Sequence, residues 1–301
     1  MCANMLVFGA NGQVGRALTG HTATLGFAHA DVDICDTTAV DCVLRAHPGT
    51  AVVNAAAFTA VDRAESEPSE AVRVNTEGAA NLARGAASAG APFIHISTDY
   101  VFDGSKQSPY REHDPIGPLG IYGLSKAKSE EAVRRACPRH VILRTSWVYS
   151  PYGTNFVRTM LRLAGERSEL QIVDDQIGCP TAAADIADAI STIVAAVRQP
   201  GFERWGIYHY CGKDIVTWFG FANLIFELAS GYGQNKPRLL PIPTASYPTS
   251  ARRPAYSVLA TDKIESTFGI RPRPLRESLT DCLDVLLKNG GSKRSSPWPN
   301  H

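Results

Sequence analysis

Thr98, Tyr122 and Lys126 are the residues of this 301-residue chain whose types and spacing predict chemistry. Tyr122 and Lys126 are four positions apart, so a helix that begins near Tyr122 places the phenol and the ammonium on one face, one turn apart. When a hydride reaches a ketone carbon, the alkoxide that forms needs a proton, and a phenol with a pKa of about 10 is a weak acid for this task. A nearby ammonium lowers the pKa of the phenol by favouring the phenolate, and a threonine hydroxyl can hydrogen-bond the carbonyl oxygen. The three residues therefore predict delivery of a proton to a carbonyl that is being reduced.

An apolar run at residues 93–96 positions Thr98. The run is typical of a buried strand, and Thr98 follows it closely. In an open α/β sheet, ligands bind beyond the carboxyl ends of the strands. A tyrosine and a lysine at helical spacing are, on their own, more often an incidental pair on a helix face. The polar strand end upstream and a glycine-rich loop near the N-terminus favour a catalytic site.

The glycine-rich loop contains Gly9, Gly12 and Gly15 and follows an apolar run at residues 5–8. A strand, a glycine loop and then a helix form the context that makes such a pattern meaningful. The first glycine permits a tight turn, the second lets the backbone approach a pyrophosphate, and the third lets the helix pack closely on the strand. The pyrophosphate would meet the positive end of the helix dipole. The loop therefore predicts a dinucleotide cofactor.

A second predicted strand, at residues 24–30, leads to Asp33. Asp33 could contact the adenosine end of the cofactor, or it could cap the helix that is expected to start near residue 37. No arginine follows this strand to bind a 2′-phosphate, and His29 is the only nearby candidate. The choice between NADPH and NADH therefore stays open from these residues.

A third apolar run, at residues 50–57, ends in small side chains. Small side chains let a flat ligand lie against the backbone, so residues 57–59 are candidate cofactor contacts. A continuous helix is expected over residues 69–90. It carries Asn75, which could simply be solvated or could fasten the neighbouring loop.

The composition is that of an ordinary globular protein, with 44% hydrophobic and 20% charged residues. A net charge of +1 gives no electrostatic reason to expect nucleic acid or a membrane surface as a partner. Seven cysteines without a Cys-x-x-Cys spacing indicate reduced thiols. No targeting segment or membrane-spanning run is expected, so the predicted location is the cytoplasm.

The remaining segments predict an α/β fold, a Rossmann-like doubly wound parallel sheet with a smaller, irregular C-terminal substrate domain. A further strand at residues 141–149 ends in Trp147 and Tyr149, which could be pocket or core. The final third is rich in proline and is expected to be irregular and lid-like. The expected division is a dinucleotide-binding domain at 1–146 and 181–212, a substrate domain at 147–180 and 213–288, and a disordered tail at 289–301.

Several longer motifs resemble one family. They are GANGQVG at 9–15, NAAAFTAVDRAESEP at 54–68, STDYVFDG at 97–104, YGLSK at 122–126, RTSWVY at 144–149, NFVRTML at 155–161, DQIGCPT at 175–181 and YPTSARRPAYSVL at 247–259. With them the chain resembles the dTDP-4-dehydrorhamnose reductases, a branch of the extended short-chain dehydrogenases/reductases. The resemblance implies reduction of the 4-keto group of a dTDP-4-dehydro-6-deoxy-L-mannose to give dTDP-L-rhamnose, normally with NADPH and possibly with NADH.

The resemblance and the residue patterns together define three sets of site residues. The catalytic set is Thr98, Tyr122 and Lys126. The substrate set is Thr98, Asp99, Tyr122 and Trp147. The cofactor set is Gly9, Asn11, Gly12, Gln13, Val14, Asp33, Ile34, Ala57, Phe58, Thr59, Asn75, Tyr122 and Lys126.

One detail favours a simple reductase within this superfamily. Related 4,6-dehydratases follow the catalytic threonine with Asp-Glu, because elimination of water needs an acid and a base. Here Thr98 is followed by Asp99 and Tyr100, so the second carboxylate is missing. The alternatives are a reductase of another dTDP-4-keto-deoxysugar, or a non-catalytic cofactor-binding subunit like the regulatory subunit of methionine adenosyltransferase.

The resemblance departs from some relatives at two positions. Those relatives hold a divalent metal between subunits with two glutamates, and the corresponding places here are Ala17 and Ala184. We therefore expect no metal, and a monomer or a weak homodimer.

Overall fold

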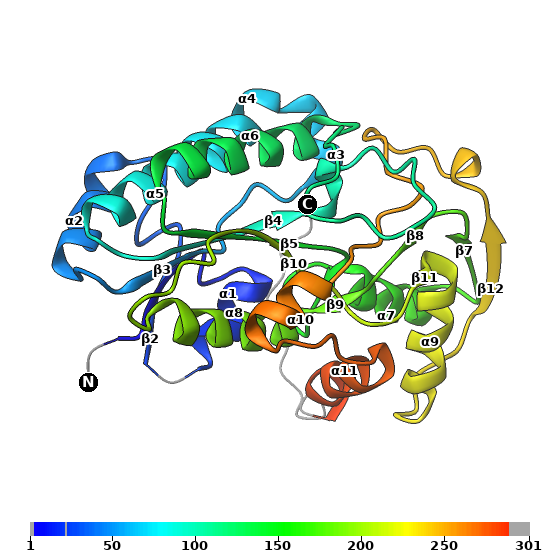
Figure 1. Ribbon diagram of the computed structural model, residues 1–301. Coiled ribbons are helices and arrows are strands. Elements are labelled where there is room, and N and C mark those ends of the chain that lie inside the picture. The colour runs from blue at the N-terminus through cyan, green and yellow to red at the C-terminus, as the bar shows by residue number, and fades with distance from the viewer. Residues whose placement is uncertain (1–2, 22, 289–301) are drawn as a thin grey trace.

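A parallel sheet forms the centre of the molecule (Figure 1). The computed structural model describes residues 3–21 and 23–288. Within them, six strands are hydrogen-bonded in the order β10-β5-β4-β3-β1-β2, and every pair is parallel. Their bounds are β1 Met5–Phe8, β2 Thr24–Phe27, β3 Ala51–Asn54, β4 Phe93–Thr98, β5 His140–Thr145 and β10 Gly206–His209. The predicted doubly wound α/β fold is confirmed.

Helices cover both faces of this sheet (Figure 1). One face packs against α2 (Thr37–Ala46), α5 (Ala79–Ser88) and α6 (Ile121–Ala136), whose apolar side chains share a core with the strands. The other face packs against α1 (Gln13–Thr19) and α8 (Ala183–Val197). Because the strands are buried on both faces, they are continuous apolar runs, which is why they could be recognised in the sequence.

A smaller group of elements lies beside the sheet (Figure 1). Its strands form three pairs, β7 (Glu169–Val173) with β12 (Arg238–Ile242), β8 (Ile177–Gly178) with β11 (Val216–Thr217), and β6 (Val148–Tyr149) with β9 (Thr181–Ala182). Around a separate apolar core lie α7 (Phe156–Glu166), α9 (Trp218–Ser230) and α11 (Leu275–Leu283), which a π-helical turn, Asp284–Lys288, extends. The predicted division into two domains stays a prediction.

The final third is more regular than expected. Besides β12 it contains a short 3₁₀ turn, Thr244–Ser246, and α10 (Asp262–Phe268). Pro241 within this segment argues against a strand when the sequence is considered alone. The structure accommodates it because proline is tolerated in a strand at the edge of a sheet, and β12 belongs to a two-stranded pair. The predicted disordered tail lies outside the described residues.

Two predicted elements are interrupted in the structure. The helix expected over 69–90 is α4 (Pro68–Val72), a π-helical turn (Arg73–Gly78) and α5, preceded by α3 (Val61–Ser66). The strand expected over 141–149 breaks into β5 and β6, because Trp147 between them has a φ of 47°. The second strand ends at Phe27, three residues earlier than expected.

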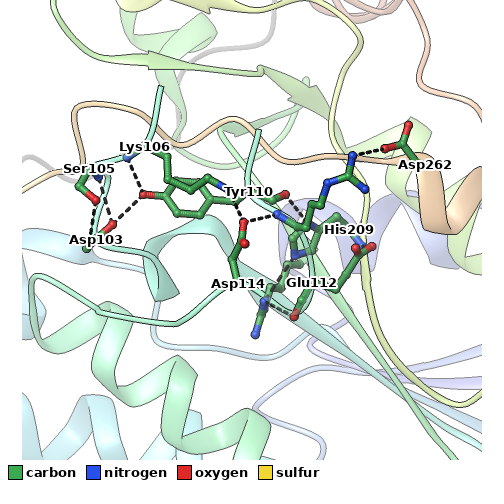
Figure 2. Close-up of polar contacts among 10 residues, drawn as sticks. Asp103, Ser105, Lys106, Tyr110, Glu112, Asp114, His209 and Asp262 are labelled. Atoms are coloured by element: carbon green, nitrogen blue, oxygen red, sulfur yellow. Dashed lines mark hydrogen bonds and ion pairs between the residues drawn. The ribbon is translucent and has the colours of Figure 1, made fainter. Parts of the chain in front are cut away.

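The long loop after the strand β4 is held by polar contacts (Figure 2). The Tyr110 hydroxyl donates to Asp103 Oδ1 at 2.7 Å, and Lys106 forms an ion pair with Asp114. Glu112 accepts from the backbone N–H of His209 on β10 at 3.1 Å. The loop is therefore tied to the sheet, which gives the start of α6 a defined position.

A buried ion pair joins α6 to β5. Arg144 donates to both oxygens of Glu130, at 2.9 and 2.7 Å, and Ser97 Oγ donates to the same carboxylate at 2.6 Å. The two charged side chains are only 3% and 5% exposed. Removing one partner of a buried pair leaves an uncompensated charge, so the pair is costly to break.

We expect Glu130→Gln to lower the free energy of unfolding by about 2–3 kcal/mol, because Arg144 then stays buried without its counter-charge. Urea denaturation measures the effect. Glu131→Gln is a matched control, since it removes an exposed carboxylate that pairs with Arg135 one turn along the same helix. Equal midpoints for the two variants would contradict the expectation.

No helix within the described residues is long and apolar enough to cross a membrane.

Candidate active site

The glycine loop lies where the order of the strands reverses. The chain passes from β1 to β2 on one side and then to β3 on the other, which is the switch point at which α/β sheets bind ligands. Gly9 has a φ of +89°, and a Cβ there would lie 2.5 Å from the backbone nitrogen of Ala56. A Cβ on Gly15 would lie 2.0 Å from the carbonyl oxygen of Gly9. Only glycine therefore fits at these two positions, as the sequence predicted.

Two clefts open from this loop and share part of their walls. The first is about 440 Å³, and Asp33 is among the residues that line it. The second is about 610 Å³ and is lined by Thr98, Tyr122 and Lys126, among others. The walls they share are Asn11, Gly12, Ala55, Ala56, Ala57 and Thr59. Together they form one elongated groove, which suits a dinucleotide that ends beside a second ligand.

The groove collects all but one of the residues predicted for the site. The first cleft is lined by Gly9, Asn11, Gly12, Asp33, Ile34, Ala57, Phe58 and Thr59. The second is lined by Asn11, Gly12, Gln13, Val14, Ala57, Thr59, Thr98, Asp99, Tyr122, Lys126 and Trp147. A larger hollow of about 910 Å³ around Glu112 and Lys263 contains none of them, so size alone does not locate the site.

Asn75 is the exception. It is 1% exposed, and its Oδ1 accepts from the backbone N–H of Phe58 at 2.7 Å. Its Nδ2 donates to the carbonyl oxygen of Phe58 at 3.1 Å and to Ser125 Oγ at 2.8 Å. Asn75 thus fastens the loop after β3 to α6, one of the two roles left open by the sequence, and lines neither cleft.

Of the two alternatives for Asp33, the prediction that it caps a helix is wrong, because Asp36 caps α2. Asp36 accepts from the backbone N–H groups of Thr38 and Ala39 at 2.9 and 3.1 Å. Asp33 instead faces the first cleft and accepts from the backbone N–H of Cys35 at 2.9 Å. Partial burial raises the pKa of Asp33, but this hydrogen bond and the guanidinium of Arg73 outweigh it and hold the pKa below its usual value. The carboxylate is therefore charged at neutral pH.

Thr98 and Asp99 form one hydrogen-bonded unit at the end of β4. Thr98 Oγ1 donates to Asp99 Oδ1 at 3.0 Å and accepts from the backbone N–H of Tyr100 at 3.2 Å. Asp99 is 1% exposed, and burial raises its pKa to about 6, against the opposing effects of the Ser257 and Thr98 side chains. Its second oxygen has no hydrogen-bond partner among the described residues, which leaves an acceptor at the edge of the second cleft.

Tyr122 lines the second cleft together with Thr98, the residue whose hydroxyl was predicted to orient a carbonyl. The sequence predicted that Lys126 lowers the pKa of this phenol. In the structure the larger effect is desolvation, which raises the pKa of Tyr122, while the nearby Thr98 side chain acts in the opposite direction. The phenol keeps its proton at neutral pH, which is the form that a proton donor needs.

Lys126 is hydrogen-bonded to the backbone of the strand β4. Its Nζ donates to the carbonyl oxygen of Ile96 at 2.7 Å, and the residue is 2% exposed. Desolvation lowers the pKa of Lys126 to about 8, against the opposite effect of the Glu130 carboxylate. No carboxylate within the described residues forms an ion pair with this buried ammonium, which still lines the second cleft.

His95 sits beside Lys126, and a network determines which of its nitrogens carries the proton. Asn54 Oδ1 accepts from the backbone N–H of Ala56 at 3.0 Å, so Asn54 Nδ2 donates to His95 Nδ1 at 3.1 Å. The proton of a neutral His95 is then on Nε2, which donates to Ser129 Oγ at 2.9 Å. Lys126 Nζ, 3.3 Å from Nε2, meets a second donor there and has protons left for a ligand. His95 was missed by sequence reasoning, although a histidine inside an apolar strand is a visible signal.

Trp147 lies against a second indole. Its ring stacks on Trp218 with centroids 3.5 Å apart, and a Cβ on Gly178 would lie 2.4 Å from it. Trp147 lines the second cleft, whereas Tyr149 is 1% exposed in the core of the smaller group of elements. The positive φ of Trp147 is a strained conformation for such a bulky residue, which is typical of functional sites.

Arg253 brings a cation into the second cleft that sequence reasoning missed. Its Nη2 donates to Asp62 Oδ2 at 2.7 Å, and its Nη1 donates to the Tyr100 hydroxyl at 3.4 Å. These contacts bring the segment after β12 over the end of β4. The signal in the sequence was the pair of arginines in the motif at 247–259.

The residues that the structure describes include no cluster of three or more His, Cys, Asp or Glu side chains that could hold a metal ion.

A glycine loop at the switch point, leading to a threonine, a tyrosine and a lysine at one end of the groove, defines an extended short-chain dehydrogenase/reductase. The chain matches the model of the RmlD substrate binding domain family over residues 3–288. A dTDP-4-dehydrorhamnose reductase of Sinorhizobium fredii is 45% identical over 95% of this chain and 98% of its own length. One of Escherichia coli K12 is 41% identical over 89% and 92%. The chain belongs to the dTDP-4-dehydrorhamnose reductase family.

Solved structures agree with this assignment. A dTDP-4-dehydrorhamnose reductase of Bacillus anthracis in complex with NADP has a TM-score of 0.88, 34% identity, and coverage of 95% of this chain and 100% of that one. One of Clostridium acetobutylicum has a TM-score of 0.87, 36% identity and coverage of 94% and 99%. A dTDP-glucose 4,6-dehydratase of Streptomyces venezuelae, at 20% identity and a TM-score of 0.77, shares the fold alone.

Proposed function

We propose that this protein reduces the 4-keto group of dTDP-4-dehydro-6-deoxy-L-mannose (dTDP-4-dehydrorhamnose) to give dTDP-L-rhamnose, with NADPH as the reductant. The observation that carries the proposal is the second cleft, where Thr98, Tyr122 and Lys126 converge beside the glycine loop. The family supports it, because relatives at 41–45% identity are named dTDP-4-dehydrorhamnose reductases and one solved relative contains NADP.

The groove fits a nicotinamide dinucleotide. The backbone around Gly12 lies at the first turn of α1, and no side chain among the described residues caps that helix end. Its free N–H groups can therefore donate hydrogen bonds to a pyrophosphate. Lys126 would bind the ribose next to the nicotinamide, and Asp33 lies at the opposite, adenosine end. NADPH, when bound, supplies the hydride.

The protein's own contribution is proton delivery. Thr98 orients the carbonyl oxygen, and Tyr122 donates its proton to the oxygen as negative charge develops there. The ammonium of Lys126 stabilises the phenolate that remains, since opposite charges interact strongly in a site shielded from water. Tyr100 stands where a dehydratase would need a second carboxylate, so the set favours net reduction.

The diphosphate and the sugar have complementary neighbours in the second cleft. Arg253 presents a guanidinium that can pair with a phosphate, and Trp147 presents an aromatic surface against which a deoxysugar can pack. We propose that both contact the substrate, together with Asp99.

The test is oxidation of NADPH by the purified protein when dTDP-4-dehydrorhamnose is supplied, with the stereochemistry at C4 of the product read by NMR. We expect NADPH consumption to depend on the keto sugar and dTDP-L-rhamnose to be the product. A panel of other dTDP-4-keto-deoxysugars serves as comparison. Preference for another sugar would replace the substrate, and absence of turnover with every sugar would overturn the proposal.

We also propose a cytoplasmic enzyme that is a monomer or a weak homodimer. The support for the second property is that Ala17 and Ala184 stand where some relatives have metal-binding glutamates. Sedimentation with and without Mg²⁺ tests it, and a tight dimer that needs the metal would contradict it.

A further inference from the structure

Arg73 lies at the adenosine end of the first cleft, although it comes from neither the glycine loop nor the segment after β2. It begins the π-helical turn that interrupts the helix after Pro68. Such turns are rare and occur frequently at functional sites. Its Nη1 lies 3.5 Å from Asp33 Oδ2, and both side chains are more than a third exposed. The structure thus joins two residues that are far apart in the sequence.

Glu70 holds Arg73 in a defined orientation. The Nε and Nη2 groups of Arg73 donate to the two carboxylate oxygens of Glu70, at 2.8 and 2.7 Å. This bidentate pair occupies one edge of the planar guanidinium. The other nitrogen, Nη1, is the one that lies beside Asp33. A donor is therefore already aimed at the place where Asp33 meets a ligand.

Asp33 by itself suits a ribose hydroxyl and not a phosphate. An acidic residue after the second strand of a dinucleotide fold hydrogen-bonds the adenosine 2′-hydroxyl, and it would repel the 2′-phosphate of NADPH. The phosphate needs a cation within reach of Asp33. In folds of this type a nearby arginine supplies it.

Two other basic side chains in the first cleft are weaker candidates. Arg63 packs over the ring of Phe58, 4.6 Å from its centroid, and pairs with Glu67 at 3.3 Å. His29 lies 3.8 Å from Asp33, but its side chain is 81% exposed. Arg73 alone combines a position beside Asp33 with a second carboxylate that fixes its geometry.

We propose that Arg73 binds the adenosine 2′-phosphate and is the residue that selects NADPH over NADH. The carboxylates of Asp33 and Glu70 leave these three side chains with a net charge of −1, so the selection is moderate and NADH is still accepted. The proposal rests on the proposed function, since it names the determinant of cofactor choice at the same site.

The test measures binding to the full-length protein by calorimetry with 2′,5′-ADP and ADP, which differ by the same phosphate. We expect Arg73→Ala to weaken 2′,5′-ADP at least about tenfold, the loss of one charge-assisted interaction, and to change ADP by no more than about twofold. NADPH and NADH should follow the same pattern. Arg73→Lys, which keeps the charge but loses the planar fork, should restore part of the affinity.

Arg45→Ala is the matched control. Arg45 also forms an ion pair with a carboxylate one helical turn away, Asp41, and lies outside both clefts. It should change neither ligand. Equal losses for 2′,5′-ADP and ADP in Arg73→Ala, or an unchanged ratio, would overturn the assignment, and a shift produced by Arg63→Ala alone would transfer the role to Arg63.

Failure of this inference is distinct from failure of the proposed function. If Arg73→Ala keeps its NADPH preference and still reduces the keto sugar, the assignment of Arg73 is wrong and the function stands. If the unaltered protein reduces no dTDP-4-keto sugar with either cofactor while 2′,5′-ADP binding still depends on Arg73, the function is wrong and the cofactor site stands.

Discussion

Tyr122→Phe should lower kcat/KM for the keto sugar by about a thousandfold, within the range that general acid catalysis contributes. The phenol lines the second cleft beside Thr98, and desolvation raises its pKa, so it is protonated at neutral pH. Phenylalanine keeps the ring, including its edge-on contact with Tyr100, and removes only the hydroxyl. Steady-state NADPH oxidation measures the loss.

A second measurement separates chemistry from folding. NADPH binding to Tyr122→Phe should stay close to that of the unaltered protein, because the glycine loop and the first cleft are unchanged. Tyr149→Phe is the control, since Tyr149 lies in the apolar core and its hydroxyl has no hydrogen-bond partner among the described residues. Activity of Tyr122→Phe within about tenfold of Tyr149→Phe would exclude Tyr122 as the proton donor, because a general acid contributes more than this.

The parts of this site that the sequence predicted are those whose geometry is local. Gly9, Gly12 and Gly15 act within one turn, and Tyr122 and Lys126 share a helix face by virtue of their spacing. The strand ends were recognisable because strands buried on both faces are apolar throughout and stop where polar residues begin. Each of these inferences depends on neighbours within a few positions.

The parts that were missed depend on contacts between distant segments. Arg73 meets Asp33 at the point where a π-helical turn replaces the α-helix, and no local pattern in 69–90 indicates that turn. Arg253 enters the second cleft through its ion pair with Asp62, far earlier in the chain. The sequence was searched for an arginine directly after the second strand. An arginine contributed by another element of the fold could not be found in this way.

The pKa of Lys126 is another property that the sequence could not predict. The spacing predicts that it stands near Tyr122, but its own pKa depends on how much water the fold removes. In the structure, desolvation lowers that pKa to about 8. The residue is therefore a buried charge that the folded state must accommodate, in addition to the role that we propose for it.

Lys126→Met should reduce kcat/KM about a hundredfold or more, comparable to removing one preorganised electrostatic donor. Methionine fills a similar volume but supplies no positive charge for the phenolate and no donor for the ribose. In the unaltered enzyme, kcat/KM should also fall as the pH rises above about 8, where Lys126 loses its proton. Lys128→Met removes the same charge from the exposed side of the helix and is the control. A variant as active as that control would contradict the role.

The difference in the free energy of unfolding between the unaltered protein and Lys126→Met should change with pH in one direction. The folded pKa of Lys126, about 8, is lower than its usual 10.5, so between these values the unfolded chain binds more protons than the folded one. The free energy of unfolding of the unaltered protein should therefore rise relative to Lys126→Met as the pH increases from 7 to 10.5. The total change is on the order of 3 kcal/mol, the value of the pKa difference. Urea denaturation of both proteins at several pH values measures it, and a difference that is constant with pH, or that falls, would show that Lys126 is not buried as an ammonium.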